Sequence, residues 1–167
     1  PDLRQLLADE DPLVRAATAY LSAWFPEDPG DSIPALTALV GCETHPSVII
    51  NALIALGLLP GTPTAMINPY LGSDENPIAW AVAAALVAAK APDEVVIARL
   101  GAALRLRSDP SDDFGLLYRY GEFSSCASKC LAAVTGDLVP LAIHTAIHAL
   151  SSGSSPQSQS ATRGAFG

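Results

Sequence analysis

The sequence is poor in aromatic residues and in charges. Aromatic side chains make up 6% of the 167 residues and charged side chains 16%, whereas half of the residues are apolar. A core with few large rings must be built mainly from Ala, Leu, Val and Ile, and such a core favours closely packed helices over sheets. We therefore predict an all-α fold.

Long apolar runs and a cysteine framework are also missing. The longest apolar stretch, Ile78–Ala89, has 12 residues, whereas a helix that spans a bilayer needs about 20. We interpret it as a buried helix and expect no membrane association. The three cysteines, Cys42, Cys126 and Cys130, are too few and too unevenly spaced for a set of disulfides, which indicates a reducing compartment and a cytoplasmic protein. Since an initiating Met and a leader pattern are missing, we expect the chain to be a piece of a longer protein.

Basic residues are scarce in the first half of the chain. Residues 1–94 have three basic side chains against twelve acidic ones, a balance of −9, and residues 95–167 have six against five, a balance of +1. Because release of counterions from phosphates drives most nucleic-acid affinity, an acidic chain without a basic stripe is a poor nucleic-acid binder. We predict a protein partner with a basic or neutral surface.

An internal repeat is present along the first two thirds of the chain. Pro46 follows Pro12 by 34 residues and Pro77 follows Pro46 by 31, and apolar residues recur at helical spacing on both sides of each proline. Asp11 and Asn76 stand directly before their prolines, as an N-cap stands before a proline at the first helical position. Each repeat is therefore predicted to be a helix, a short turn and a second helix.

Five such hairpins and a tail account for the whole chain. The predicted units cover residues 1–26, 33–60, 64–91, 94–121 and 123–150 of one repeat domain at 1–150. Stacked hairpins of this kind form an α-solenoid. Residues 151–167, which are rich in Ser and show no periodicity, are predicted to be a disordered tail.

The second helix of the first unit resembles that of a HEAT repeat. The family's pattern of Asp, then Val-Arg, then small and apolar residues is matched by Asp11, Val14, Arg15, Ala16, Ala17 and Leu21. The first unit alone has the Arg, since Ile49 and Trp80 take its place in the next two units. The resemblance covers residues 1–107 and implies a curved stack of the HEAT/armadillo kind, whose surface binds other macromolecules, often proteins.

Two cysteines and two histidines near the C-terminus are candidate metal ligands. They read C-x3-C, thirteen intervening residues and H-x3-H, and they are Cys126, Cys130, His144 and His148. This spacing is close to that of a Cys2His2 zinc site, although zinc fingers place their cysteines on a loop and not on a helix. Alternatively, the cysteines pack between helices and the histidines lie at the solvent edge, beside core residues Ile143 and Ile147. We predict no metal and keep zinc as the alternative.

The tryptophans and the loop carboxylates are the candidate contact residues. Trp80 takes the position of Arg15, which is too polar for the interior, so we expect Trp80 at the surface against a partner. Trp24 is expected in the core beside Phe25. The acidic candidates for a basic partner are Asp28, Asp31, Asp74 and Glu75. Alternatively, acidic residues that precede helices only cap free N–H groups.

The sequence shows no catalytic signature. It has no nucleophile in a strand-turn-helix context and no Gly-rich phosphate loop. We therefore predict no catalytic residues, no cofactor and a non-enzymatic protein–protein interaction scaffold that uses one face of a HEAT-like solenoid. The alternative is a nucleic-acid enzyme resembling the HEAT-like DNA glycosylases, which requires a basic surface that the balance of −9 in residues 1–94 opposes.

Overall fold

Helices make up all of the regular structure in the described part of the chain. The computed structural model describes residues 3–25, 29–74, 76–105 and 123–152. Its α-helices are α1 (Pro12–Trp24), α2 (Pro29–Cys42), α3 (Pro46–Leu58), α4 (Asn76–Ala88), α5 (Glu94–Ala103), α6 (Phe123–Ala133) and α7 (Val139–Ser152). Its 3-10 helices are η1 (Leu3–Ala8), η2 (Thr64–Met66), η3 (Asn68–Gly72) and η4 (Gly136–Leu138). The all-α prediction is confirmed.

Proline and aspartate fix the starts of the helices in the repeat. α1 and α3 begin at Pro12 and Pro46, because a proline at the first helical position gives up no hydrogen bond. The carboxylate of Asp11 accepts a hydrogen bond from the backbone N–H of Leu13 at 2.9 Å, so the predicted cap of α1 is confirmed. α4 begins at Asn76, one residue before the third proline of the repeat.

Two segments predicted as first helices of a hairpin are 3-10 helices. η1 is six residues long, and the segment before α4 is divided into η2 and η3. Pro69 lies in this second segment, where its missing N–H and its ring prevent one continuous α-helix. Ile67, between η2 and η3, is fully buried and anchors the segment to the core.

Some boundaries differ from the predicted ones. α2 begins at Pro29 and not at residue 33, and α7 ends at Ser152, so the helical region runs two residues into the predicted tail. The rest of that tail, residues 153–167, and the predicted second helix of the fourth unit, within residues 106–122, lie outside the described residues.

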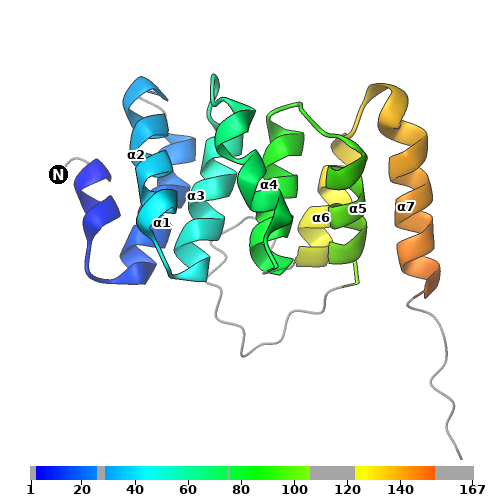
Figure 1. Cartoon of the computed structure of the whole chain (residues 1–167), viewed down its shortest axis with the longest axis horizontal. Coiled ribbons are helices and arrows are strands. Elements are labelled where there is room, and N and C mark those ends of the chain that lie inside the picture. Colours follow the sequence, from blue (N-terminus) through cyan, green and yellow to red (C-terminus); the bar gives the residue numbers. More distant parts are fainter. Residues whose placement is uncertain (1–2, 26–28, 75, 106–122, 153–167) are drawn as a thin grey trace, which may run out of the picture.

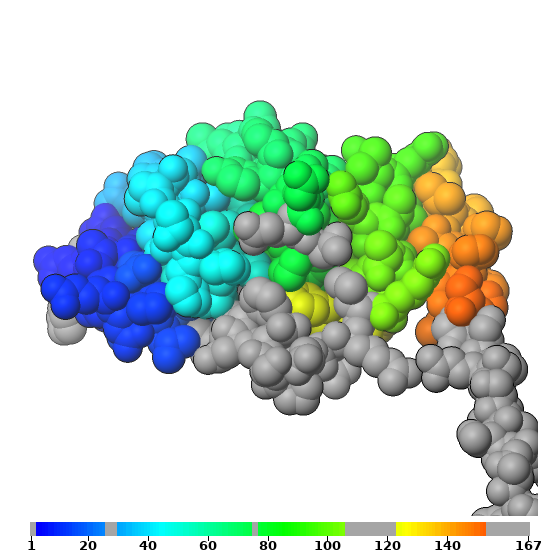
Figure 2. Space-filling model, turned by 60° about the horizontal axis from the view of Figure 1, so that its bottom comes forward, coloured from blue at the N-terminus to red at the C-terminus, as the bar shows by residue number. Residues whose placement is uncertain are grey.

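The helices lie in two rows along the long axis of the molecule (Figure 1). One row consists of α1, α3, α4 and α6, each in contact with the next. The second row includes α2, which packs on α3, then α5, which packs on α4 and α6, and then α7, which packs on α5 and α6. α1 lies near one end of the long axis and α7 forms the other (Figure 2), while α6 lies between α4 and α5 in the view of Figure 1. No helix in the described ranges is long and apolar enough to cross a membrane.

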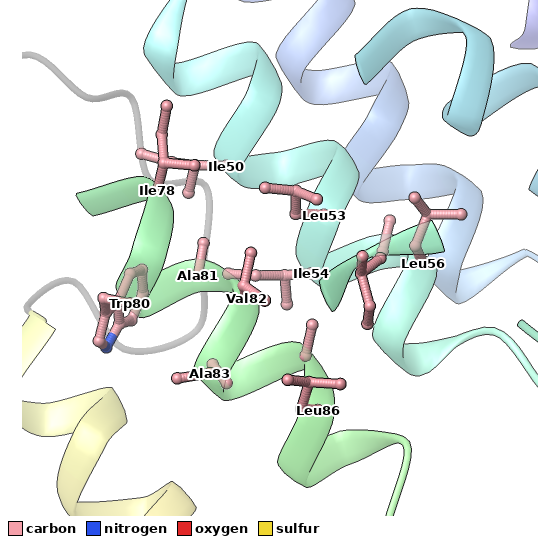
Figure 3. Packing of buried hydrophobic residues seen from close by; sticks show 14 of the residues in the cluster. Ile50, Leu53, Ile54, Leu56, Ile78, Trp80, Ala81, Val82, Ala83 and Leu86 are labelled. Atoms are coloured by element: carbon pink, nitrogen blue, oxygen red, sulfur yellow. The ribbon is translucent and has the colours of Figure 1, made fainter. Parts of the chain in front are cut away.

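The core is thickest between α3 and α4. Eleven of the thirteen residues of α3 are buried, and Figure 3 shows Ile54 of α3 beside Val82 of α4. A Cβ added to Gly57 would collide with the Cα and the carbonyl oxygen of Ala85, so the two helices meet at backbone contact. Gly57 and Ala85 both lie near the C-terminal ends of their helices. α3 and α4 run in the same direction (Figure 1).

Candidate functional site

Trp80, predicted at the surface, is buried, and Trp24, predicted in the core, is exposed. Trp80 is 2% exposed, and its ring packs edge-to-face against Phe123 of α6 with ring centroids 4.5 Å apart. Figure 3 shows it on the side of α4 that faces α6. Trp24 is 44% exposed at the end of α1. The predicted surface contact at Trp80 is wrong because α6 covers this residue, and the predicted core position of Trp24 is wrong as well.

Arg15 explains why the prediction for Trp80 failed. The Arg15 and Glu43 side chains are only 18% and 6% exposed, and Arg15 Nε and Nη2 donate to the two Glu43 carboxylate oxygens at 2.7 and 3.1 Å. Arg15 Nη1 donates to the carbonyl oxygens of Asp9 and Glu10 at 2.8 and 3.0 Å. A charged residue is tolerated at this inner position because its donors meet acceptors. The corresponding position of α4 is more deeply buried, and the apolar ring of Trp80 fills it.

Glu43 fixes the turn between α2 and α3. Its Oε1 accepts hydrogen bonds from the backbone N–H groups of Thr44 and His45, both at 2.9 Å. The hydrogen bond from Arg15, which is opposed by burial and assisted by these backbone donors, lowers the pKa of Glu43 to about 2. The same bond raises the pKa of Arg15. Arg15 and Glu43, which we call the clamp, therefore tie the turn before α1 to the turn before α3.

The structure does not bring the predicted acidic contacts together. Asp31 is exposed in the first turn of α2 and forms an ion pair with Arg4, whereas Asp74 is exposed in the turn before α4. α2 starts at the edge of the molecule where α3 ends, and α4 starts at the opposite edge (Figure 1). Asp28 and Glu75 lie outside the described residues.

A different set of acidic residues lies along the edge where α1, α3 and α4 begin. Glu10 and Asp11 are exposed before α1, and Asp74 is exposed before α4. These residues can be identified in the sequence, but their position at one edge cannot. It follows from the fact that α1, α3 and α4 run in the same direction. At the other edge, Asp93 caps α5 by accepting from the backbone N–H of Val96 at 2.8 Å, as the capping alternative predicted for acidic residues.

α1 has an exposed apolar stripe that was not identified from the sequence. Leu13, Tyr20 and Trp24, which we call the α1 stripe, recur at i, i+7 and i+11 and so share one helix face. Leu13 and Trp24 are exposed, Tyr20 is half-buried, and the Tyr20 and Trp24 rings are 6.0 Å apart. Phe25, directly after the helix, is also exposed. The helical spacing of these residues was the signal that could have located the stripe.

The four candidate zinc ligands do not converge on one point. Cys126 is buried in α6, with its Sγ 3.9 Å from that of Cys130. His144 and His148 are exposed on α7 with stacked rings 6.4 Å apart, and His148 Nδ1 lies 3.5 Å from the guanidinium of Arg105. Each pair has i, i+4 spacing and so shares a helix face, but Cys126 faces the core while both histidines face solvent. Within the described ranges, no group of three or more His, Cys, Asp or Glu side chains is arranged to hold a metal ion.

The two thiols interact with each other. With Cys126 as the donor, their hydrogen bond raises the pKa of Cys126 and lowers the pKa of Cys130, and burial adds to the rise at Cys126. Cys126 lies in the core, where the packing alternative placed it. The geometry therefore gives no support to a four-ligand zinc site.

Two of the basic side chains in the acidic half are engaged by carboxylates. Arg4 pairs with Asp31, and Arg15 pairs with Glu43. These pairs leave less positive charge for phosphates, which weakens the nucleic-acid alternative.

Comparison of the chain with models of protein families, with curated proteins and with solved structures finds no match. The surfaces described above are therefore the basis for inferring a function.

Proposed function

We propose that the chain forms a HEAT-like α-solenoid and acts in the cytoplasm as a non-enzymatic scaffold that binds a protein partner through its N-terminal half. The observation that carries this proposal is the combination of exposed aromatic and acidic groups on α1 and at its start. Trp24 and Tyr20 belong to the residue types most enriched at protein interfaces. Glu10 and Asp11, before the same helix, favour a partner with a basic or neutral contact surface.

The order of the helices supports the solenoid part of the proposal. η1 with α1, α2 with α3, and α6 with α7 are neighbours in the chain and contact one another in space. In a repeat protein each unit contacts mainly its neighbours, and the stack offers a long continuous surface without any special residue. Binding through such a surface needs no catalytic group.

The proposed contact surface differs from the predicted set of residues. It consists of the α1 stripe and Glu10, with Asp74 further along the same edge, and Trp80 is removed from it because Trp80 is buried. Asp31 is engaged by Arg4 and contributes less net charge. The stripe supplies apolar area at the centre of the contact, and the carboxylates supply a charged rim.

The test is capture of partners on the immobilised full chain from extracts of the source cells, with quantification by mass spectrometry. A double variant, Glu10→Lys with Trp24→Ala, is expected to lose the proteins that the natural chain retains. The matched control is Asp137→Lys, which makes the same charge change at an exposed position in η4. If the double variant retains the same proteins as the control, the N-terminal half is not the contact surface.

A gel-retardation assay with duplex DNA at low salt tests the nucleic-acid alternative. We expect no shift, because a protein without a basic stripe gains little from counterion release. A shift that weakens as salt is raised would favour the nucleic-acid enzyme over the scaffold.

A further inference from the structure

The last helix exposes an apolar face at one end of the molecule. Ile143, Ile147 and Leu150 of α7 are 56%, 63% and 66% exposed. Their spacing of i, i+4 and i+7 places them on one side of the helix. α7 forms the end of the helix rows (Figure 2), so this side faces away from α5 and α6. We call these three residues the α7 face.

Small residues decide which side of α7 packs on the fold. Ala142 and Ala149 are buried, and a Cβ on Gly101 of α5 would collide with the Thr145 methyl group. Close approach of α7 to α5 therefore depends on small side chains at the contact, and the larger isoleucines are turned outward. The sequence interpretation placed Ile143 and Ile147 in the core, and the structure corrects it for this reason.

The charge distribution favours a second copy of this chain over a charged partner. α7 contains no Asp, Glu, Lys or Arg, and its two titratable groups, His144 and His148, are exposed beside the α7 face. The acidic excess lies in residues 1–94, while residues 95–167 have a balance of +1. Two chains that meet through α7 keep their acidic halves at far ends, beyond the screening length of about 8 Å at physiological salt.

The pattern of the α7 face is complementary to itself. Ile147 lies at its centre, with Ile143 four residues before it and Leu150 three residues after it. In an antiparallel pair with a two-fold axis near Ile147, that residue meets its own copy, and Ile143 of each chain lies near Leu150 of the other. A two-fold contact requires this kind of self-matching patch.

We propose that the α7 face is a homodimer interface in which two α7 helices pair antiparallel. This inference goes beyond the proposed function and uses a different surface, at the opposite end of the molecule from the α1 stripe. Because one helix from each chain contributes, the interface is smaller than the standard size of about 800 Å² per partner, and the dimer is weak, with a dissociation constant on the order of micromolar.

Sedimentation velocity over a wide range of protein concentration tests the dimer. The natural chain is expected to pass from monomer to dimer, and Ile147→Lys is expected to raise the dissociation constant by about a hundredfold or more, because both chains bring a charge to the centre of the contact. Leu58→Lys makes the same kind of change at an exposed apolar position of α3, outside both proposed surfaces, and should leave the transition in place. A natural chain that stays monomeric at every concentration overturns the proposal, as does an unchanged transition in Ile147→Lys. Circular dichroism confirms that each variant is folded.

Cross-linking tests the antiparallel arrangement. In a Cys42→Ser background, which removes the exposed native thiol, Ile147→Cys is expected to form covalent dimers under mild oxidation. A mixture of Ile143→Cys and Leu150→Cys chains should cross-link faster than either variant alone. Faster cross-linking of each variant with itself than in the mixture would indicate a parallel pair and would overturn the antiparallel arrangement.

Discussion

The central helices and the end helices of this molecule are covered to very different degrees. α3 and α4 have apolar residues on all sides and are buried almost throughout, whereas α1 and α7 each turn one apolar face to solvent. A helix that is hydrophobic all round must lie inside the fold. An apolar face left exposed at the end of a stack marks a surface where another molecule can bind. The core of the molecule is thus concentrated in its middle, and its candidate contacts lie at its ends.

The largest expected difference between middle and ends is at the two tryptophans. Trp80→Ala should lower the free energy of unfolding by about 3–5 kcal/mol, because it empties a filled position between α4 and α6. Trp24→Ala should cost about 1 kcal/mol or less, since the side chain is already half in water. Urea denaturation followed by circular dichroism measures both. Equal costs would contradict the division between a buried middle and open ends.

Acid should weaken the clamp, the ion pair between Arg15 of α1 and Glu43 in the turn before α3. The pKa of Glu43 is lowered from 4.5 to about 2, so its contribution to stability is fully present above pH 4.5 and is lost as the pH falls through about 2. The shift corresponds to at most about 3.5 kcal/mol of unfolding free energy. Glu43→Gln should be less stable at neutral pH and should lose most of this dependence. Parallel stability curves for the two proteins between pH 5 and pH 2 would show that the clamp does not stabilise the fold.

Two glycine-to-alanine substitutions compare the effect of an added methyl group on stability in the centre of the molecule and at its surface. Gly57→Ala should destabilise the fold by about 1–3 kcal/mol, because the new methyl group meets the Ala85 backbone, which cannot move alone. Gly41→Ala in α2 meets no atom within 4 Å and should be neutral or stabilising by up to about 1 kcal/mol, since Gly disfavours helix. Thermal melting of both variants checks the pair. A tolerated Gly57→Ala would mean that α3 and α4 are less closely packed than the structure shows.

The smallest expected loss of stability is at the N-cap of α5, the helix that lies between the central α4 and the terminal α7. Asp93→Ala removes the acceptor for the Val96 N–H and should lower stability by about 1 kcal/mol. Asp93→Asn keeps an acceptor and serves as the control, with a loss of only a few tenths of a kcal/mol. If the two variants lose the same stability, charge matters at this position more than the cap bond does.

Local signals in the sequence predicted the fold class and several helix starts. Pro12, Pro46 and Asp11 act through backbone chemistry that depends only on their immediate neighbours, so their effect can be read without the fold. Pro69 was the local signal that should have reduced the predicted helix before α4 to 3-10 turns. The helices lie in two rows, whereas the identification of this arrangement as a HEAT-like solenoid remains a prediction.

The candidate sites could not be predicted as well, because burial depends on what lies opposite a residue. The charge of Arg15 predicts an exposed position, but pairing with Glu43, 28 residues away, allows its side chain to be only 18% exposed. The size of Trp24 favours a core position, but its place at the end of α1 leaves it 44% exposed. The outward turn of Ile147 follows from the small residues on the other side of α7, a preference that hydrophobicity alone does not indicate.

The contact between Gly57 and Ala85 also fixes how α3 and α4 are oriented relative to each other. Because α3 and α4 touch at the backbone, one added methyl group at Gly57 would push the two helices apart at that point. A change in the angle between α3 and α4 displaces atoms more the farther they lie from the contact. The α1 stripe and the α7 face, at the two ends, would therefore move relative to each other. A substitution deep in the molecule could thus alter whether two partners bound at its ends can be held at once, without touching either surface.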